Sequence, residues 1–200
     1  MIKKMTLHHP TIIYLIAFLY NCFKKNNAWR YNNIKCKGAF LSNVKFNIHG
    51  KNNKIQIGEK ARLKNCKVFI QGNNCQLTIG SGSTIISNTI FFLQDNNCKV
   101  IIGNNFTMEG GHIAATESEA IIIGNDCMFS DDIEIRNGDS HSIIKQGTEK
   151  RINWARSINI GNHVWLTAHV RVLKGSNIPD NSIIANSSVV TSKLEYSNSI

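Results

Sequence analysis

The residues best suited to acid–base chemistry lie in one polar segment, which reads Arg136-Asn137-Gly138-Asp139-Ser140-His141-Ser142-Ile143. Histidine exchanges a proton near neutral pH, the property needed to activate a weakly acidic hydroxyl group. Asp139 either holds the imidazole of His141 in one tautomer or shapes a turn beside glycine. Arg136 either pairs with Asp139 or another acid of the segment, or meets a carboxylate on a substrate. The segment therefore predicts a general base, His141, in a polar loop.

A repeat of apolar residues surrounds this segment and predicts the element that positions it. After the segment, an apolar residue recurs at every sixth position: Ile160, Leu166, Val172, Ile178, Ile184 and Val190. Before it, the same spacing runs in blocks of three: Ile57, Leu63, Phe69; Ile79, Ile85, Phe91; Ile102, Met108, Ala114; Ile123, Phe129, Ile135. A period of six is typical of a short strand plus a turn, wound repeatedly around a coil. We predict a triangular coil with these residues in its core.

The motif Ile-x-Ile-Gly, or a close variant of it, marks the start of each block, at Gly58, Gly80, Gly103, Gly124 and Gly161. Glycine is expected there because it permits the backbone angles of a corner. The glycines lie 22, 23, 21 and 37 residues apart, against the roughly 18 that three hexads need. The excess residues fall at one corner, and the longest insertion, residues 136–156, contains His141. A loop this long in a regular coil is expected to be functional or disordered.

The predicted organisation is an N-terminal helical or capping segment, residues 1–46, followed by the coil, residues 47–200. The apolar run from Ile12 to Phe23 is shorter than the ~20 residues of a membrane-spanning helix. Basic residues follow it, so the stretch 12–30 either packs on the end of the domain or lies on an anionic membrane surface. Cys75 and Cys98 follow the same Asn-Asn pair and are expected near each other, as small half-buried thiols rather than as a disulfide or a metal site.

The composition limits the partners. Lys and Arg outnumber Asp and Glu by 23 to 13, so the surface attracts anions such as CoA phosphates or acidic glycans. No arginine-rich helix, zinc-finger spacing or aromatic RNA-binding motif accompanies this excess, and no nucleic acid partner is predicted. The six cysteines form no C-x-x-C pair and no cleavable secretion signal is recognised, which favours a cytoplasmic protein.

Two motifs resemble those of the polysaccharide and capsule O-acetyltransferases, including the sialic acid polymer acetylators, within the hexapeptide-repeat acyltransferase superfamily. Arg136, Asp139, His141 and Ile143 match Arg-x-x-Asp-x-His-x-Ile, and residues 160–166 are similar to Ile-Gly-x-x-Val-Trp-Ile. The resemblance covers roughly Ile48 to Lys193. It implies a mainly β fold, a left-handed parallel β-helix with a protruding loop.

The resemblance also implies a site. It makes His141 the general base and Trp165 the residue that orients the thioester or the nucleophile, and we expect the two rings side by side at a shared edge of the coil. It implies acetyl-CoA as co-substrate, held between neighbouring subunits of a homotrimer, by Ala168, Lys174, Asn186, Thr191, Ser192 and Lys193. Thr167 and Asn186 depart from the family, which usually has Gly and a small residue at these positions.

His112, His163 and His169 raise the alternative of a zinc site, as in β-helical carbonic anhydrases. His163 and His169 lie one hexad apart, hence on different faces, and the sequence shows no obvious acidic residue to support them. We predict no metal. The expected reaction is transfer of acetyl to a hydroxyl of a surface glycan of capsule or lipopolysaccharide type, and the positive net charge suits an acidic glycan. Two alternatives stay open: N-acetylation of a nucleotide-linked amino sugar or other small acceptor, and a non-catalytic β-helical scaffold.

Overall fold

The computed structural model describes residues 31–191 and residue 194. These residues form three parallel sheets of seven strands each. Sheet A consists of β1 (Asn33–Lys35), β4 (Lys54–Ile57), β7 (Gln76–Ile79), β10 (Lys99–Ile102), β13 (Ala120–Ile123), β16 (Ile158–Ile160) and β19 (Asn177–Ile178). Sheet B consists of β2 (Phe40–Ser42), β5 (Arg62–Lys64), β8 (Thr84–Ile85), β11 (Thr107–Met108), β14 (Met128–Phe129), β17 (Trp165–Leu166) and β20 (Ile183–Ile184). Sheet C consists of β3 (Lys45–His49), β6 (Lys67–Gln71), β9 (Ile90–Gln94), β12 (Gly111–Ala115), β15 (Ile133–Arg136), β18 (Arg171–Leu173) and β21 (Val189–Val190).

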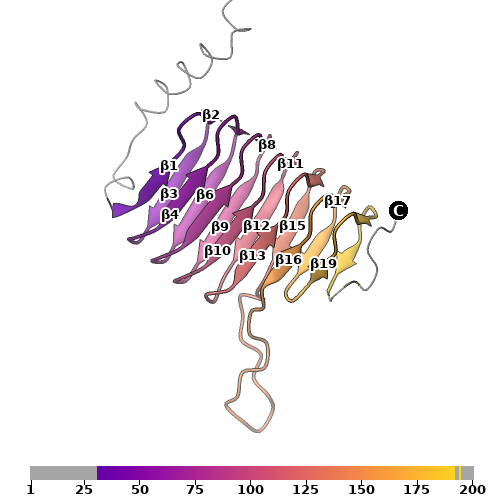
Figure 1. Ribbon diagram of the computed structural model, residues 1–200. Helices are drawn as coiled ribbons and strands as arrows, with labels where there is room; N and C mark the ends of the chain where they lie inside the picture. Colours follow the sequence, from indigo (N-terminus) through magenta and orange to yellow (C-terminus); the bar gives the residue numbers. More distant parts are fainter. Residues whose placement is uncertain (1–30, 192–193, 195–200) are drawn as a thin grey trace, which may run out of the picture.

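The chain visits the three sheets in turn, so that each strand pairs in parallel with the strand three places later. The result is a β-helix of seven turns, stacked side by side in Figure 1, from which one long loop projects at an edge. The mainly β, parallel coil predicted from the period of six is confirmed. No helix in the described part of the chain is long and apolar enough to cross a membrane.

The coil begins earlier than the sequence predicted. Residues 33–46 were assigned to the capping segment, yet β1 and β2 already form the first turn, with Ile34 and Leu41 buried. This turn lacks the marker motif, because Cys36 and Lys37 stand where later turns have Ile and Gly. The boundary at residue 47 is therefore wrong. The predicted N-terminal helical segment falls mostly on residues 1–30, which lie outside the described residues.

A continuous apolar column fills the coil. Phe106 and Phe129, both fully buried, pack edge to face with ring centroids 4.9 Å apart. Most predicted hexad positions belong to this column, but Phe69 and Ala114 do not. Val68 and Ile113 take their places, in register with Phe91. The corner between sheets B and C is one residue shorter in these two turns, and a shift of one residue moves a strand side chain to the opposite face.

The glycines at the corner between sheets A and B have a different role from the one expected. Gly80 and Gly103 do not have a positive φ. Instead, a Cβ added at Gly80 would lie 2.2 Å from the carbonyl oxygen of Gly103. Glycine is required here because the backbones of adjacent turns approach too closely for any side chain.

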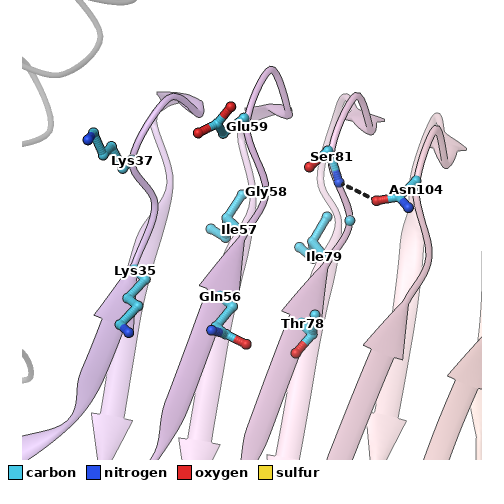
Figure 2. A pocket seen from close by; sticks show the side chains of 11 residues that line it. Lys35, Lys37, Gln56, Ile57, Gly58, Glu59, Thr78, Ile79, Ser81 and Asn104 are labelled. Atoms are coloured by element: carbon cyan, nitrogen blue, oxygen red, sulfur yellow. Dashed lines mark hydrogen bonds between the residues drawn. The ribbon is translucent and has the colours of Figure 1, made fainter.

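Asparagine side chains hold the same corner together. The backbone N–H of Ser81 donates to Oδ1 of Asn104 at 2.9 Å (Figure 2), and that of Asn104 donates to Oδ1 of Asn125 at 2.8 Å. The series continues through Asn162 to Asp180. Each side chain satisfies a backbone donor of the preceding turn, which gives a physical reason for the Gly-Asn pairs in the sequence.

Cys75 and Cys98 lie on adjacent turns, where the N–H of Gln76 donates to the carbonyl oxygen of Cys98 at 2.9 Å. The predicted proximity is confirmed. Both thiols are free and buried, like the other cysteines of the coil interior. Hydrogen bonding to Cys75, together with burial, raises the pKa of the Cys98 thiol. The pair fills the core at a corner, as small apolar residues do.

Candidate active site

The long loop connects β15 in sheet C to β16 in sheet A and leaves the coil at the edge between these sheets. In Figure 1 it projects well beyond the stacked turns. Its outer half is a small hairpin, in which Ile144 and Arg151 form an antiparallel bridge. The N–H of Ile152 donates to the carbonyl oxygen of Ile143 at 2.9 Å. Backbone hydrogen bonds within the loop therefore hold its outer half as a hairpin.

Asn153 fixes the base of the loop. Its Oδ1 accepts from the backbone N–H of Ile143 at 2.7 Å, and its Nδ2 donates to Oδ2 of Asp139 at 2.9 Å and to the carbonyl oxygen of His141 at 2.7 Å. The side chain is almost fully buried. One amide therefore joins both strands of the loop and sets the position of the His141 backbone.

Asp139 acts in this network and not on the imidazole. It accepts hydrogen bonds from the Lys174 ammonium group and from Asn153, and no bond joins it to the His141 ring within the described residues. The Lys174 ammonium group holds the pKa of the Asp139 carboxyl below its usual range. Of the two sequence interpretations, shaping the loop is the one that the contacts support.

Arg136 pairs with Glu134 on β15, and not with Asp139 or another acid of the loop, as one interpretation expected. Its Nε donates to Oε1 of Glu134 at 3.1 Å, and its Nη1 donates to Oγ of Ser140 at 3.3 Å. Glu134 also lies 3.4 Å from the Nε atom of Arg171. This network links the start of the loop to sheet C of the next turn.

His141 itself is exposed on the loop, and its ring makes no hydrogen bond to the described residues, 31–191 and 194. The main chain is held by Asn153 while the imidazole faces solvent. A ring in this state is free to accept a proton from a hydroxyl group bound beside it.

Trp165 does not lie beside His141 in the same chain, so the expectation of a shared edge is wrong. Trp165 belongs to β17 in sheet B, whereas the loop leaves the edge between sheets C and A, which is opposite sheet B in a triangular coil. The repeat in the sequence predicts on which sheet a residue lies, but not how far a projecting loop lies from a residue on another sheet. Within one chain, the two rings occupy unrelated surfaces.

Exposed apolar side chains mark both surfaces. On sheet B, Trp165 stands in register between Met128 and Ile183, and all three are more than one third exposed. The loop exposes four more large apolar side chains: Ile143, Ile144, Ile152 and Trp154. Clusters of exposed apolar residues of this kind mark interaction surfaces.

The residues expected to bind CoA fall at two corners. Ala168 and Asn186 stack at the corner between sheets B and C, where the N–H of Ser187 donates to the carbonyl oxygen of Ala168 at 3.0 Å. Lys174 and Thr191 follow β18 and β21, at the other end of these strands. Thr167, unusual for the family, donates its hydroxyl to the carbonyl oxygen of Ile184 at 2.8 Å. Ser192 and Lys193 lie outside the described residues.

The three histidines of the metal alternative are dispersed. His112 lies on β12 in sheet C, while His163 and His169 stand at different corners. Nδ1 of His169 is 2.9 Å from Oδ2 of Asp132. Within the part of the chain that the structure describes, no three His, Cys, Asp or Glu side chains are grouped for a metal ion.

Several residues at the base of the loop were not singled out from the sequence. Glu117 accepts from the backbone N–H of Ala155 at 2.8 Å and pairs with Arg151, whose guanidinium group stacks on the ring of Trp154 at 4.4 Å. These residues line a hollow of about 650 Å³ beside the loop. Asn153 and Glu117 lie 14 and 22 residues from Asp139 along the chain, so no local motif contains them.

Asn153→Ala is expected to lower the turnover rate of the site roughly ten- to hundredfold with little change in KM, since the His141 backbone loses its anchor. Asn153→Asp should behave similarly, because it removes both donors and places a second carboxylate against Asp139. Steady-state kinetics and thermal melting test this. The control is Asn159→Ala, an exposed asparagine on the neighbouring β16. Unchanged kcat in both Asn153 variants would contradict the positioning role.

Comparison with known proteins agrees with the fold and with the motifs. No protein-family model matches the chain. The chain is 32% identical over 145 residues to a polysialic acid O-acetyltransferase of Neisseria meningitidis. The aligned residues make up 72% of this chain and 66% of the relative. A polysialic acid O-acetyltransferase of Escherichia coli O1:K1 / APEC is 38% identical over 69 residues, or 34% of this chain and 22% of the relative. The chain thus spans only part of the length of these relatives.

Two solved structures share the coil. That of the polysialic acid O-acetyltransferase OatWY has a TM-score of 0.80 and 30% identity, over 84% of this chain and 78% of the other. That of the polySia-specific acetyltransferase NeuO has a TM-score of 0.61 and 27% identity, over 82% and 74%. The left-handed β-helix expected from the resemblance is confirmed by the first of these. The chain therefore belongs to the hexapeptide-repeat acetyltransferases, and within them it resembles the polysialic acid O-acetyltransferases.

Proposed function

We propose that this chain is an O-acetyltransferase that moves acetyl from acetyl-CoA to a hydroxyl group of a bacterial surface glycan, of capsule or lipopolysaccharide type. The relatives are named for O-acetylation of polysialic acid, which favours a hydroxyl over an amine as the acceptor. Acetyl-CoA is a cytoplasmic metabolite, and we place the protein in the cytoplasm.

In the proposed reaction, His141 takes the proton of the acceptor hydroxyl while the hydroxyl oxygen attacks the thioester carbonyl of acetyl-CoA. The C–S bond breaks as the tetrahedral intermediate collapses, and the CoA thiolate receives the proton from the imidazole. The acetyl group goes directly to the acceptor oxygen, with no acyl-enzyme. The ring of His141 is exposed, makes no hydrogen bond to the described residues, and stands on a backbone held by Asn153, which suits this role.

We further propose that the active site forms between subunits of a homotrimer. The observation that carries this proposal is the separation of His141 and Trp165 on opposite sides of one coil. The loop and sheet B both expose apolar side chains, so the loop of one subunit can cover sheet B of the next. Such a contact uses two different surfaces, and it closes into a ring when the rotation between subunits allows. In this arrangement His141 meets the partner's Trp165.

Mixed trimers test the shared site. His141→Ala and Trp165→Ala are each expected to be poorly active, and a coexpressed mixture should recover about a quarter of the wild-type activity, since one in four interfaces then has an intact His141 and an intact partner's Trp165. If both residues acted within one chain, no mixture would recover activity. As a control, the two variants are purified separately and mixed under conditions that prevent subunit exchange, and this mixture should recover no activity.

Acceptor identity is tested by incubating the protein and acetyl-CoA with a panel of acidic and neutral glycans and an amino-sugar nucleotide. Mass spectrometry should show acetyl esters on the acidic polymer. Acetylation confined to the nucleotide sugar would identify an N-acetyltransferase. A scaffold would show no product and no increase in melting temperature with millimolar CoA, because a ligand of the folded state stabilises it by mass action.

A further inference from the structure

The charge of this protein is divided sharply along the chain. The first 67 residues contain 14 of the 23 Lys and Arg residues but one of the 13 Asp and Glu residues. The remaining residues carry 9 basic and 12 acidic side chains. The positive net charge therefore belongs to the N-terminal end and not to the turns around the loop. A division of this kind indicates a separate interaction of the basic part.

The described cations of this part surround the first two turns of the coil. All of them are exposed, and they lie on all three sheets and at the corners between them. Lys35 and Lys54 are on sheet A, Arg62 and Lys64 on sheet B, and Lys45 and Lys67 on sheet C, while Lys37, Lys51 and Lys60 are at corners. Figure 2 shows two of them, Lys35 and Lys37, beside an open hollow of about 380 Å³ on sheet A. Glu59 is the one acid among residues 31–67.

None of these nine side chains forms an ion pair with another described residue, whereas four of the eight described cations after residue 67 do. Arg136, Arg151 and Lys174 each pair with a carboxylate. In the first two turns, Lys45 lies directly opposite Lys67 in register, an arrangement that is unfavourable for the folded coil. An external anion bound beside the two lysines reduces this repulsion.

Protection of the open sheet edge does not explain these residues. Lysines on an edge strand do prevent pairing with other chains. However, the second turn is not an edge, and it carries Lys54, Arg62 and Lys67. The opposite end of the coil, residues 175–191, has an edge as well, and its one charged residue is Asp180.

The partner is either a linear acidic polymer or a flat anionic surface, and the arrangement favours the surface. A polymer bound on its way to the loop needs a continuous basic track. Between the cationic turns and the loop, residues 68–135 contain one cation, Lys99, and eight acidic residues. Cations on all three faces of one end suit a plane that meets the coil end-on.

We propose that the N-terminal end of the coil docks on the anionic phospholipids of a membrane. Residues 1–30 add five basic residues, no acidic ones and the apolar run from Ile12 to Phe23, a composition suited to an anionic bilayer surface. Adjacent strands lie about 4.8 Å apart, so the loop of the fifth turn stands roughly 20 Å above the first. In a trimer, three parallel ends strengthen the contact by multivalency.

Cosedimentation of the full chain with vesicles tests this. The protein should bind vesicles of phosphatidylcholine with about one third phosphatidylglycerol and not pure phosphatidylcholine, and high salt should release it. The variant Lys54→Gln/Lys64→Gln/Lys67→Gln should bind roughly 10- to 100-fold more weakly. Its control, Lys99→Gln/Lys145→Gln/Lys150→Gln, loses the same charge elsewhere and should bind like the wild type.

Amine labelling read by mass spectrometry locates the contact. Anionic vesicles should protect Lys35, Lys45 and Lys54 and leave Lys99 and Lys145 reactive. Equal binding by the two triple variants, or no binding to anionic vesicles, would overturn the proposal. Binding to soluble acidic polymer but not to vesicles would instead assign these turns to the acceptor. Acetyl transfer to a short soluble acceptor is a separate measurement, so failure here leaves the proposed activity standing.

Discussion

Replacement of His141 by alanine is expected to lower kcat for acetyl transfer about 10²- to 10⁴-fold, the usual contribution of a positioned base. The imidazole is exposed and makes no hydrogen bond to the described residues, so its loss removes no structural contact. The melting temperature should stay within about 1 °C of the wild type, as for other surface substitutions. Release of the CoA thiol in the presence of an acidic glycan measures the rate.

The matched control is His49→Ala, because His49 is also exposed but lies at the end of β3 in the first turn. Its kcat should equal that of the wild type. Retention of wild-type kcat by His141→Ala would remove the general base from the mechanism. A fall in kcat accompanied by a lower melting temperature would assign His141 a structural role instead.

Much of the coil was predictable because its period is a property of consecutive residues. An inward side chain at every sixth position leads to three faces per turn, and Leu63, Ile85 and Phe129 lie in the core as expected. The period fails where a corner changes length by one residue, as it does before Val68 and Ile113. The first turn escaped notice for a related reason, because Cys36 and Lys37 replace the marker residues.

The candidate site was predicted only in part. The loop was identified by its interruption of the period, and the motif singled out His141 within it. The partners of the loop were not predictable, because Asn153 reaches Asp139 only when the loop folds back on itself, and Lys174 reaches it only when β18 stacks on β15 in sheet C. The separation of His141 from Trp165 also depends on which edge the loop leaves. A linear motif carries neither kind of information.

The largest expected loss of stability comes from the glycine corner that repeats through the coil. Gly80→Ala should destabilise the protein by about 3 kcal/mol, since the new Cβ would lie 2.2 Å from the carbonyl oxygen and 2.3 Å from the carbonyl carbon of Gly103. These atoms belong to the backbone of the next turn, and moving them requires the two turns to separate. In a coil where each turn is covered by its neighbours, that separation weakens the whole column. The melting temperature should fall by roughly 6 to 12 °C.

The control Gly147→Ala distinguishes this collision from the general effect of removing a glycine. Gly147 lies at the tip of the loop with φ of +74°, and a Cβ there meets nothing within 4 Å. The cost should be about 1 kcal/mol or less and confined to the loop. If both variants show the same fall in melting temperature, the need for glycine at the corner comes from its backbone angles and not from the close spacing of the turns. If only Gly80→Ala has a lowered melting temperature, and it keeps its kcat at low temperature, the glycine corner stabilises the coil without contributing directly to catalysis. The coil then supports the site only by holding sheets C and A in place where the loop begins.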